Sequence, residues 1–170
     1  MSFLELAKDR YSCRKFSDRA IEQEKIDKII EAAMVAPTAA NLQPFRIWQA
    51  SKKETIDKIA KATPFTFGVS LILVVGANKS RAYNRNFDGK NFAEIDASIV
   101  ATHIMMEIQD LGLATTWIGH FDPVALKKEF PEMEKYEVVA IFPIGYAAEG
   151  AKISELHYNS RTKEELLTIL

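Results

Sequence analysis

The chain has 170 residues, of which 48% are hydrophobic and 26% are charged, and its formal net charge is -1. This composition is typical of one globular domain over residues 1–170 and excludes a low-complexity or strongly basic chain, so we expect no nucleic acid or membrane partner. The single cysteine, Cys13, excludes an intrachain disulfide, and no apolar leader or membrane span is evident, so we expect a cytoplasmic protein.

The first half of the chain combines helical spacing of apolar residues with short apolar runs. Apolar residues recur every three to four positions from Glu22 to Val35, which predicts a helix. Pro37 ends it, because proline disfavours helical geometry in the preceding residue. A Ser51–Glu54 pair at capping-box spacing predicts the start of another helix. The elements predicted for this half are helices at Phe3–Lys8, Glu22–Val35 and Ser51–Ala62, and strands at Phe45–Ala50 and Leu71–Ala77.

The second half begins with a polar segment, Asn78–Asn91, which is either an exposed loop or a flexible lid. The longest predicted helix, Asp96–Leu111, follows it. The middle of this helix is apolar on nearly every side, so a core or a second subunit must cover it. The other elements predicted here are strands at Ala114–Ile118 and Glu137–Tyr146, a helix to Phe130 that Asp122 caps and Pro123 begins, and a helix to Leu170 capped by Thr162 and Glu165.

The order of these elements predicts the fold class. Helices come first and the strands are scattered, without strict alternation of strand and helix. This order favours an α+β fold over a doubly wound parallel sheet. The seven glycines include no G-x-G pair, so the chain has neither a dinucleotide fingerprint nor a P-loop.

Two arginines and a serine alternate in the run DRYSCRKFSD, as Arg10, Ser12 and Arg14. Each guanidinium offers a planar fork of donors and the hydroxyl adds one more, so the cluster suits a phosphate. Surface charge beside a helix end is the alternative explanation for a single arginine. The three residues together favour an anion-binding segment.

A second polar run, APTAANLQPF, places Asn41 and Gln43 after the predicted end of a helix. Their amides both donate and accept hydrogen bonds, which is the mixture that the pyrimidine edge of a flavin needs. Turn chemistry is the alternative explanation for Thr38 and Asn41, whereas Gln43 is not a turn residue and Pro44 fixes the chain after it. One segment could therefore hold the phosphate of a flavin nucleotide and the other its ring.

Together these segments resemble the FMN-dependent nitroreductase family, whose members carry an Arg-x-Ser-x-Arg run and, later, an Ala-Pro-Ser/Thr turn before Asn-x-Gln-Pro-aromatic. Three further segments resemble the family: Gly112–Asp122, Ile144–Tyr146 and Ser160–Arg161. The resemblance runs from about Phe3 to Leu167. It implies a central, mostly antiparallel sheet wrapped by helices, a bound FMN, and a homodimer in which the flavin lies near the interface.

The resemblance also implies which residues contact the cofactor. Tyr11 departs from the family, which often has arginine there, and His120 stands where the family often has glycine. A backbone N–H near Gly119 is expected to point at the flavin N5, and the His120 imidazole is either a proton donor or a side chain turned to solvent. The full expected FMN-binding set is Arg10, Tyr11, Ser12, Arg14, Pro37, Thr38, Asn41, Gln43, Trp117, Ile118, Gly119 and Arg161.

The resemblance implies an oxidoreductase that passes hydride from NADH or NADPH through FMN to a nitroaromatic, a quinone or a similar small acceptor. Two alternatives stay open. One is another flavin reaction of the same fold, such as dehalogenation, enoyl reduction or flavin breakdown. The other is a flavin-binding module for storage or sensing without turnover. His103 and Glu107, one helical turn apart, are too few ligands to predict a metal site.

Overall fold

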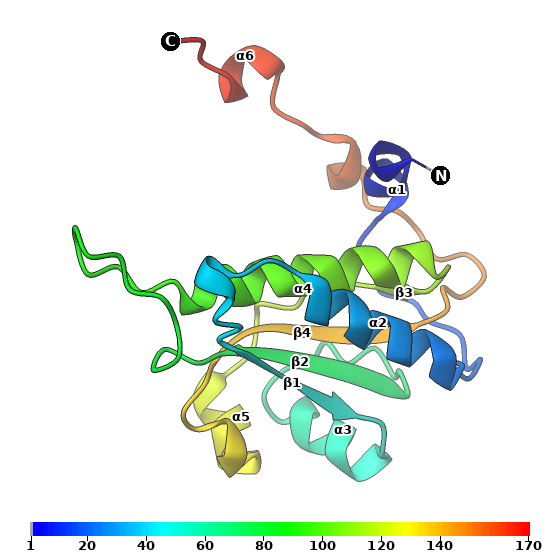
Figure 1. Cartoon of the computed structure of the whole chain (residues 1–170). Helices are drawn as coiled ribbons and strands as arrows, with labels where there is room; N and C mark the ends of the chain where they lie inside the picture. The colour runs from blue at the N-terminus through cyan, green and yellow to red at the C-terminus, as the bar shows by residue number, and fades with distance from the viewer. Residues whose placement is uncertain (1) are drawn as a thin grey trace.

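A four-stranded antiparallel sheet forms the centre of the computed structural model, which describes residues 2–170 (Figure 1). The strands are β1 (Phe45–Ala50), β2 (Leu71–Ala77), β3 (Ala114–Thr115) and β4 (Glu137–Gly145), in the spatial order β1-β2-β4-β3. Every neighbouring pair is antiparallel. The predicted α+β fold with a mostly antiparallel sheet is therefore confirmed.

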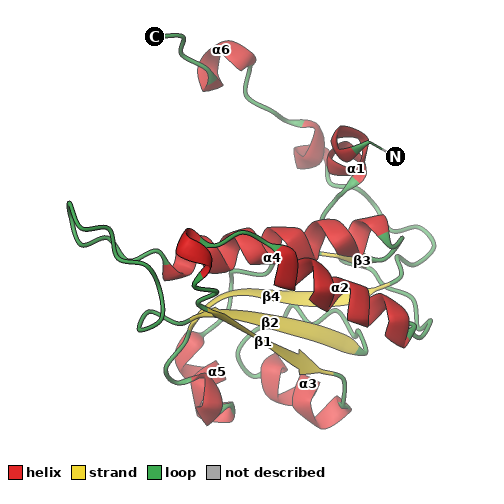
Figure 2. Cartoon of the chain, in the orientation of Figure 1, coloured by secondary structure: helices red, strands yellow, loops and turns green. Residues whose placement is uncertain are grey.

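Helices cover both faces of the sheet (Figure 2). Two long helices, α2 (Gln23–Val35) and α4 (Ala93–Asp110), lie on one face, and α3 (Lys53–Ala60) and α5 (Pro123–Glu129) lie on the other. Strand β2 is buried along its whole length, and its side chains alternate between the two layers. This double burial explains why its sequence is a continuous apolar run.

The helix caps follow the local sequence in most places. Asp122 accepts hydrogen bonds from two backbone amides at the start of α5, as predicted. Thr162 and Glu165 form the predicted capping box of α6 (Lys163–Leu166), which ends four residues before the predicted Leu170. The remaining helix, α1 (Phe3–Asp9), and three short 3-10 turns, η1 (Ala39–Asn41), η2 (Pro131–Met133) and η3 (Glu155–Tyr158), complete the described elements.

Two predicted helix starts are wrong. The Ser51–Glu54 capping box does not form, because α3 begins at Lys53 and Ser51 lies outside it, with no side-chain cap at this end. Helix α4 begins at Ala93, three residues before the predicted Asp96, and the Asn91 side chain accepts a hydrogen bond from the Ala93 amide. Asp96 therefore lies inside the helix and not at its boundary.

The predicted strand Ala114–Ile118 is also too long, because β3 ends at Thr115. In the antiparallel register Thr116 would face Pro143, which has no N–H to donate. The Thr115 hydroxyl instead donates a hydrogen bond to the Pro143 carbonyl, at 2.7 Å. Pairing resumes for one residue, where Ile118 and Ile141 exchange hydrogen bonds of 3.0 and 3.1 Å. Residues 116 and 117 are thereby released from the ladder next to the sheet edge.

Two segments project from this body (Figure 1). The Asn78–Asn91 segment, predicted as a loop or lid, is a finger held by an Asn84–Asn91 bridge and an Arg85–Asp88 ion pair, with Phe87 98% exposed at its tip. The chain after β4 leads to η3, which lies beside α1, and then to α6, which projects farther from the sheet. No helix among residues 2–170 is long and apolar enough to cross a membrane.

Candidate functional site

The Arg10–Arg14 segment is extended and lies beside β3. The Cys13 amide donates to the Thr115 carbonyl at 3.0 Å, and Ser12 bridges Thr115 in parallel. Side chains alternate in an extended chain, and the Cys13 side chain is 0% exposed. Arg10, Ser12 and Arg14 therefore share the outer side, where all three line one cavity of about 290 Å³.

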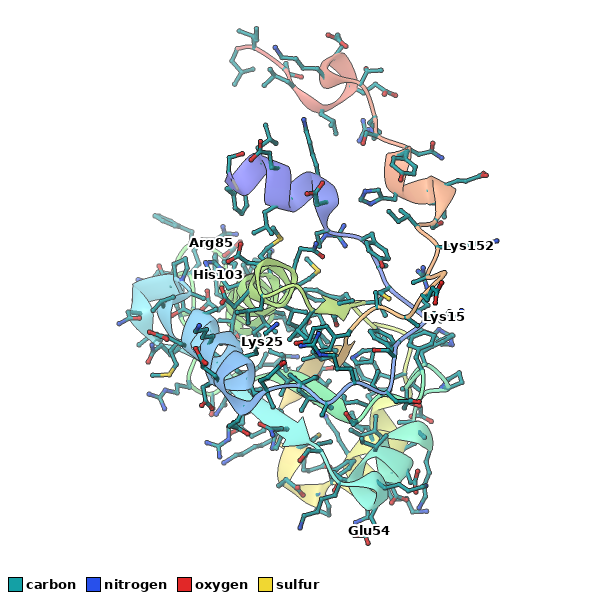
Figure 3. The ribbon with its side chains drawn as sticks, turned by 90° about the vertical axis from the view of Figure 1, so that its right-hand side faces the viewer. Lys15, Lys25, Glu54, Arg85, His103 and Lys152 are labelled. Atoms are coloured by element: carbon teal, nitrogen blue, oxygen red, sulfur yellow. The ribbon has the colours of Figure 1, made fainter. Side chains whose placement is uncertain are left out.

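This cavity, which we call the arginine cavity, is closed by the chain that follows β4. Ser154, Leu156 and His157 supply its other wall, and His157 Nε2 lies 3.1 Å from the Lys8 carbonyl. Lys15 donates to the Glu149 carbonyl at 2.9 Å and holds the two segments side by side, as Figure 3 shows near Lys15. The arginine cavity thus combines two guanidinium groups and a hydroxyl, which suits a phosphate.

Tyr11, the departure from the family pattern, also lines the arginine cavity. Partial burial raises the pKa of its hydroxyl above the ordinary value of 10.0, and the nearby Cys13 thiol adds to the shift. The hydroxyl is therefore neutral at physiological pH. It can donate a hydrogen bond to an anion in the arginine cavity without adding negative charge.

A second cavity of about 180 Å³ adjoins the first, because Arg14 lines both. Its other walls are the backbone and side chains of Thr116–His120, together with Phe65 and Phe67. We call it the Gly119 cavity. A Cβ atom built on Gly119 would have no neighbour within 4 Å, so a planar group can approach this backbone closely. The residues present therefore fit a flavin nucleotide: the arginine cavity offers donors suited to a phosphate, and the Gly119 cavity offers an open backbone suited to a planar ring.

Besides the Ile118–Ile141 backbone pair, three side-chain contacts fix the Thr116–His120 segment. Thr63, which is buried, donates its hydroxyl to the His120 carbonyl at 2.8 Å. Trp117 packs edge-on against Phe142 in the core, with ring centroids 5.3 Å apart. The exposed His120 ring meets the Phe65 ring edge-on at 5.7 Å. The segment is thus held from behind, while Gly119 and His120 face outward.

Phe65 and Phe67 were not among the predicted site residues. They lie in the turn between α3 and β2, where Phe67 has a left-handed φ of 52°. Their rings are 6.0 Å apart, and Phe16 continues the aromatic row at 6.2 Å from Phe67. The signal available in the sequence was the pair of aromatics in Pro64–Gly68, a turn where polar residues are more usual.

The Thr38–Gln43 segment lies at the opposite end of the molecule. The Ala39 amide donates to the Asp96 carboxylate near the start of α4, at 3.0 Å. The Arg10–Arg14 segment adjoins Thr115, just beyond the end of the same helix. The stretch of α4 from Asp96 to its end spans about 22 Å at the usual rise per residue. Within one chain, therefore, Asn41 and Gln43 do not reach the arginine cavity (Figure 1).

The structure also leaves Pro37 and Arg161 apart from both cavities. Pro37 follows the end of α2, next to the Thr38–Gln43 segment. Arg161 lies in the projecting tail, where its guanidinium donates to the Glu165 carbonyl at 2.7 Å and lines neither cavity. His103 Nδ1 lies 3.1 Å from the Ile99 carbonyl, and residues 2–170 contain no cluster of three metal-ligating side chains.

Comparison with known proteins identifies the family to which this fold belongs. Residues 7–64 and 62–146 match the nitroreductase family. An Archaeoglobus fulgidus protein named as an NADH dehydrogenase/NAD(P)H nitroreductase is 30% identical over 153 residues and covers 84% of each chain. A solved nitroreductase-family structure from Clostridium difficile 630 is 37% identical, covers 99% of this chain and 98% of its own, and has a TM-score of 0.91. A solved nitroreductase in complex with FMN, from Exiguobacterium sibiricum, covers 100% and 98% with a TM-score of 0.84 at 19% identity, and is similar in fold. This chain therefore belongs to the nitroreductase family.

Proposed function

We propose that the protein binds FMN and passes hydride from NADH or NADPH to a small acceptor such as a nitroaromatic or a quinone. This proposal depends mainly on one observation: Arg14 lines both the arginine cavity, which suits a phosphate, and the Gly119 cavity, where the glycine backbone is open. The fold similarity to a protein solved with FMN supports the same cofactor. The lone, buried Cys13 suits a reducing compartment, so we place the activity in the cytoplasm.

Different residues of this chain bind the phosphate, contact the flavin ring and donate a proton. Arg10, Ser12 and Arg14 hold the phosphate, and the backbone at Gly119 meets the ring. When bound, FMN supplies the hydride chemistry, so the protein needs no strong acid or base of its own. The exposed His120 imidazole lines the Gly119 cavity, where it can donate a proton to a reduced acceptor.

We further infer that each site is shared by two subunits of a homodimer. Asn41 and Gln43 are exposed and lie at the wrong end of α4 to serve the flavin of their own chain. A twofold pairing would bring them to the partner's Gly119 cavity. In this arrangement one subunit binds the phosphate and the other contacts the pyrimidine edge.

Two apolar surfaces support the pairing. A groove of about 670 Å³ runs between α1, α2 and α4, where Phe3, Leu6, Val35 and Met106 are part of its lining and His103 of α4 lies beside α2 (Figure 3). The projecting tail carries a matching excess of exposed apolar side chains: Leu156, Tyr158, Leu166, Leu167, Ile169 and Leu170. Exposed apolar surface of this extent marks an interaction site in a stable protein.

Release of the bound chromophore tests the cofactor. Heating followed by chromatography should recover FMN and not FAD, and apoprotein should take up FMN. Addition of NADH or NADPH should bleach the flavin, and an acceptor should restore its colour. Flavin that binds but is never bleached by either nicotinamide would favour the storage or sensing alternative.

Mixed dimers test the sharing of the site. One chain carries Arg14→Ala and the other Gln43→Glu, with different affinity tags so that only the heterodimer is purified. If the site is shared, one site of each heterodimer keeps both native residues and binds FMN with native affinity. If each chain builds its own site, both sites carry a substitution and neither binds normally.

A further inference from the structure

Asp96 is a buried carboxylate that neither cavity uses. It lies in the first turn of α4 and is 1% exposed, among buried apolar neighbours that include Ala93, Ala97 and Val100. Its Oδ1 accepts the hydrogen bond from the Ala39 amide at 3.0 Å. Its Oδ2 has no partner among residues 2–170. Burial of a carboxylate with one oxygen unpaired is costly, and such a group calls for an explanation.

The backbone that Asp96 holds is itself unusual. Ala40, Asn41 and Gln43 adopt left-handed φ angles of 52°, 52° and 47°. Asparagine tolerates this conformation, whereas alanine and glutamine disfavour it because Cβ crowds the following carbonyl. Three left-handed residues within four positions, two of them strained, persist only where surrounding contacts enforce them.

The contacts around this segment are not equivalent. Thr38 Oγ1 accepts from the Gln43 amide at 3.0 Å, and Arg81 Nε donates to the Leu42 carbonyl at 3.1 Å, but both bonds are exposed to water. The Asp96 bond is partly buried and ties the segment to the core helix. Hydrogen bonds to charged groups are also the stronger kind. Asp96 is thus the contact best able to set where Asn41 and Gln43 point.

We propose that Asp96 is the positioning residue of the pyrimidine-edge segment: its carboxylate fixes the Ala39 backbone so that Asn41 and Gln43 are presented to FMN in the partner subunit. The inference rests on the proposed function, because it takes the ligand of those amides to be FMN. Asp96 does not touch FMN in this arrangement, but it controls the affinity for FMN through its hydrogen bond to the Ala39 main chain.

A simpler role is stabilisation of α4, since a negative charge is favourable near a helix N-terminus. Glu94 lies in the same turn, is exposed and pairs with Lys79 at 3.1 Å. Replacing Glu94 removes the same charge from the same turn without touching the Ala39 amide. Glu94→Gln is therefore the matched control for Asp96→Ala.

The experiment measures FMN affinity of the refilled apoprotein by quenching of flavin fluorescence. Asp96→Ala should weaken FMN binding by about tenfold or more, the loss expected when one charge-assisted hydrogen bond is removed. Glu94→Gln should leave the affinity within about twofold, as for a surface change away from the site. Asp96→Asn keeps an oxygen for the Ala39 amide, so its affinity should stay closer to the wild type than that of Asp96→Ala.

A double substitution separates positioning from general stability. If Asp96 acts through Gln43, the variant Asp96→Ala/Gln43→Ala should bind FMN no more weakly than the weaker single variant. A purely structural role predicts that the two losses multiply, and that result would overturn the inference. Asp96→Ala binding FMN as tightly as the wild type would overturn it as well. If the wild-type protein binds no FMN at all, the proposed function fails instead, so the two failures are distinguishable.

Discussion

Gly76 is the last residue but one of β2, where the structure leaves no room for a side chain. A Cβ atom added there would lie 2.8 Å from Cζ3 and 3.0 Å from Cη2 of Trp48, and 3.2 Å from the Cβ of Tyr136. The Trp48 ring is itself held edge-on against Tyr136, with centroids 4.9 Å apart. Gly76→Ala must therefore displace a packed indole, and overpacking of this kind costs about 1–3 kcal/mol. For a chain of this length, that cost lowers Tm by roughly 2–12 °C.

Thermal unfolding followed by circular dichroism measures this effect. Trp48→Phe provides the internal check, because a smaller ring leaves space for the added methyl. Gly76→Ala should therefore cost less in the Trp48→Phe background than in the wild type, a coupling that a double-mutant cycle reports directly. An unchanged Tm in the single Gly76→Ala variant would show that the Trp48 indole moves freely and that the close approach of Gly76 to this ring does not require glycine.

Four further predictions concern the site, the pH dependence and the pairing of subunits. Gly119→Ala should leave Tm unchanged, since no atom lies near the added methyl, but should weaken FMN binding; retention of full flavin would contradict the placement of the ring. Arg14→Ala should weaken FMN binding by about 1.5–3 kcal/mol in a titration, and lysine should not fully restore it, because the guanidinium fork is lost. The pKa of Glu22 is lowered from 4.5 to about 2, chiefly by the hydrogen bond from Tyr146. The contribution of Glu22 to stability is therefore complete above pH 4.5 and is lost as pH falls through about 2. In urea unfolding, the difference in unfolding free energy between the wild type and Glu22→Gln should close over that pH range, and a difference that stays constant with pH would refute the prediction. Met106→Glu should abolish the proposed dimer in sedimentation while the subunit stays folded, and a stable dimer would exclude the groove from the interface.

Among the apolar residues in the middle of α4, Met106 is the position at which a substitution best tests the pairing. The apolar middle of the long helix predicts a core or a partner, and both Ile104 and Met105 fit that pattern. Ile104 is 0% exposed in the core of its own chain, and Met105 packs against the same core. Glutamate at Ile104 would disturb folding and pairing together. Met106 is only partly buried and lines the groove instead, so its substitution bears more directly on pairing.

Local chemistry explains two of the helix starts that could be predicted, although the equally local Ser51–Glu54 capping box does not form. The Asp122–Pro123 start of α5 and the capping box at Thr162 depend on residues that are adjacent in sequence, and both form. The early end of β3 depends on Pro143, which is distant in sequence and faces Thr116 only once the sheet register is known. The periodicity of residues 114–118 contains no information about that facing residue.

The same division holds for the site. Arg10, Ser12 and Arg14 lie within five residues, so their shared side follows from the alternation of an extended chain. Phe65 and Phe67 reach the Gly119 cavity through the turn before β2, and this depends on tertiary packing. The sequence spacing does not indicate how far apart the Arg10–Arg14 and Thr38–Gln43 segments lie in the folded chain.

That distance gives the proposed mechanism its main structural constraint. Since α4 separates the two polar segments by about 22 Å, an isolated chain offers FMN either its phosphate donors or its amides. A ligand that contacts both subunits stabilises the dimer by mass action, and dimer formation in turn strengthens ligand binding. Loss of FMN from an Arg14 variant and from a Met106 variant would therefore look alike in a flavin titration. Oligomeric state at high protein concentration separates them: the Arg14 variant should still pair through its apolar groove, whereas the Met106 variant should not pair even when its phosphate donors are intact.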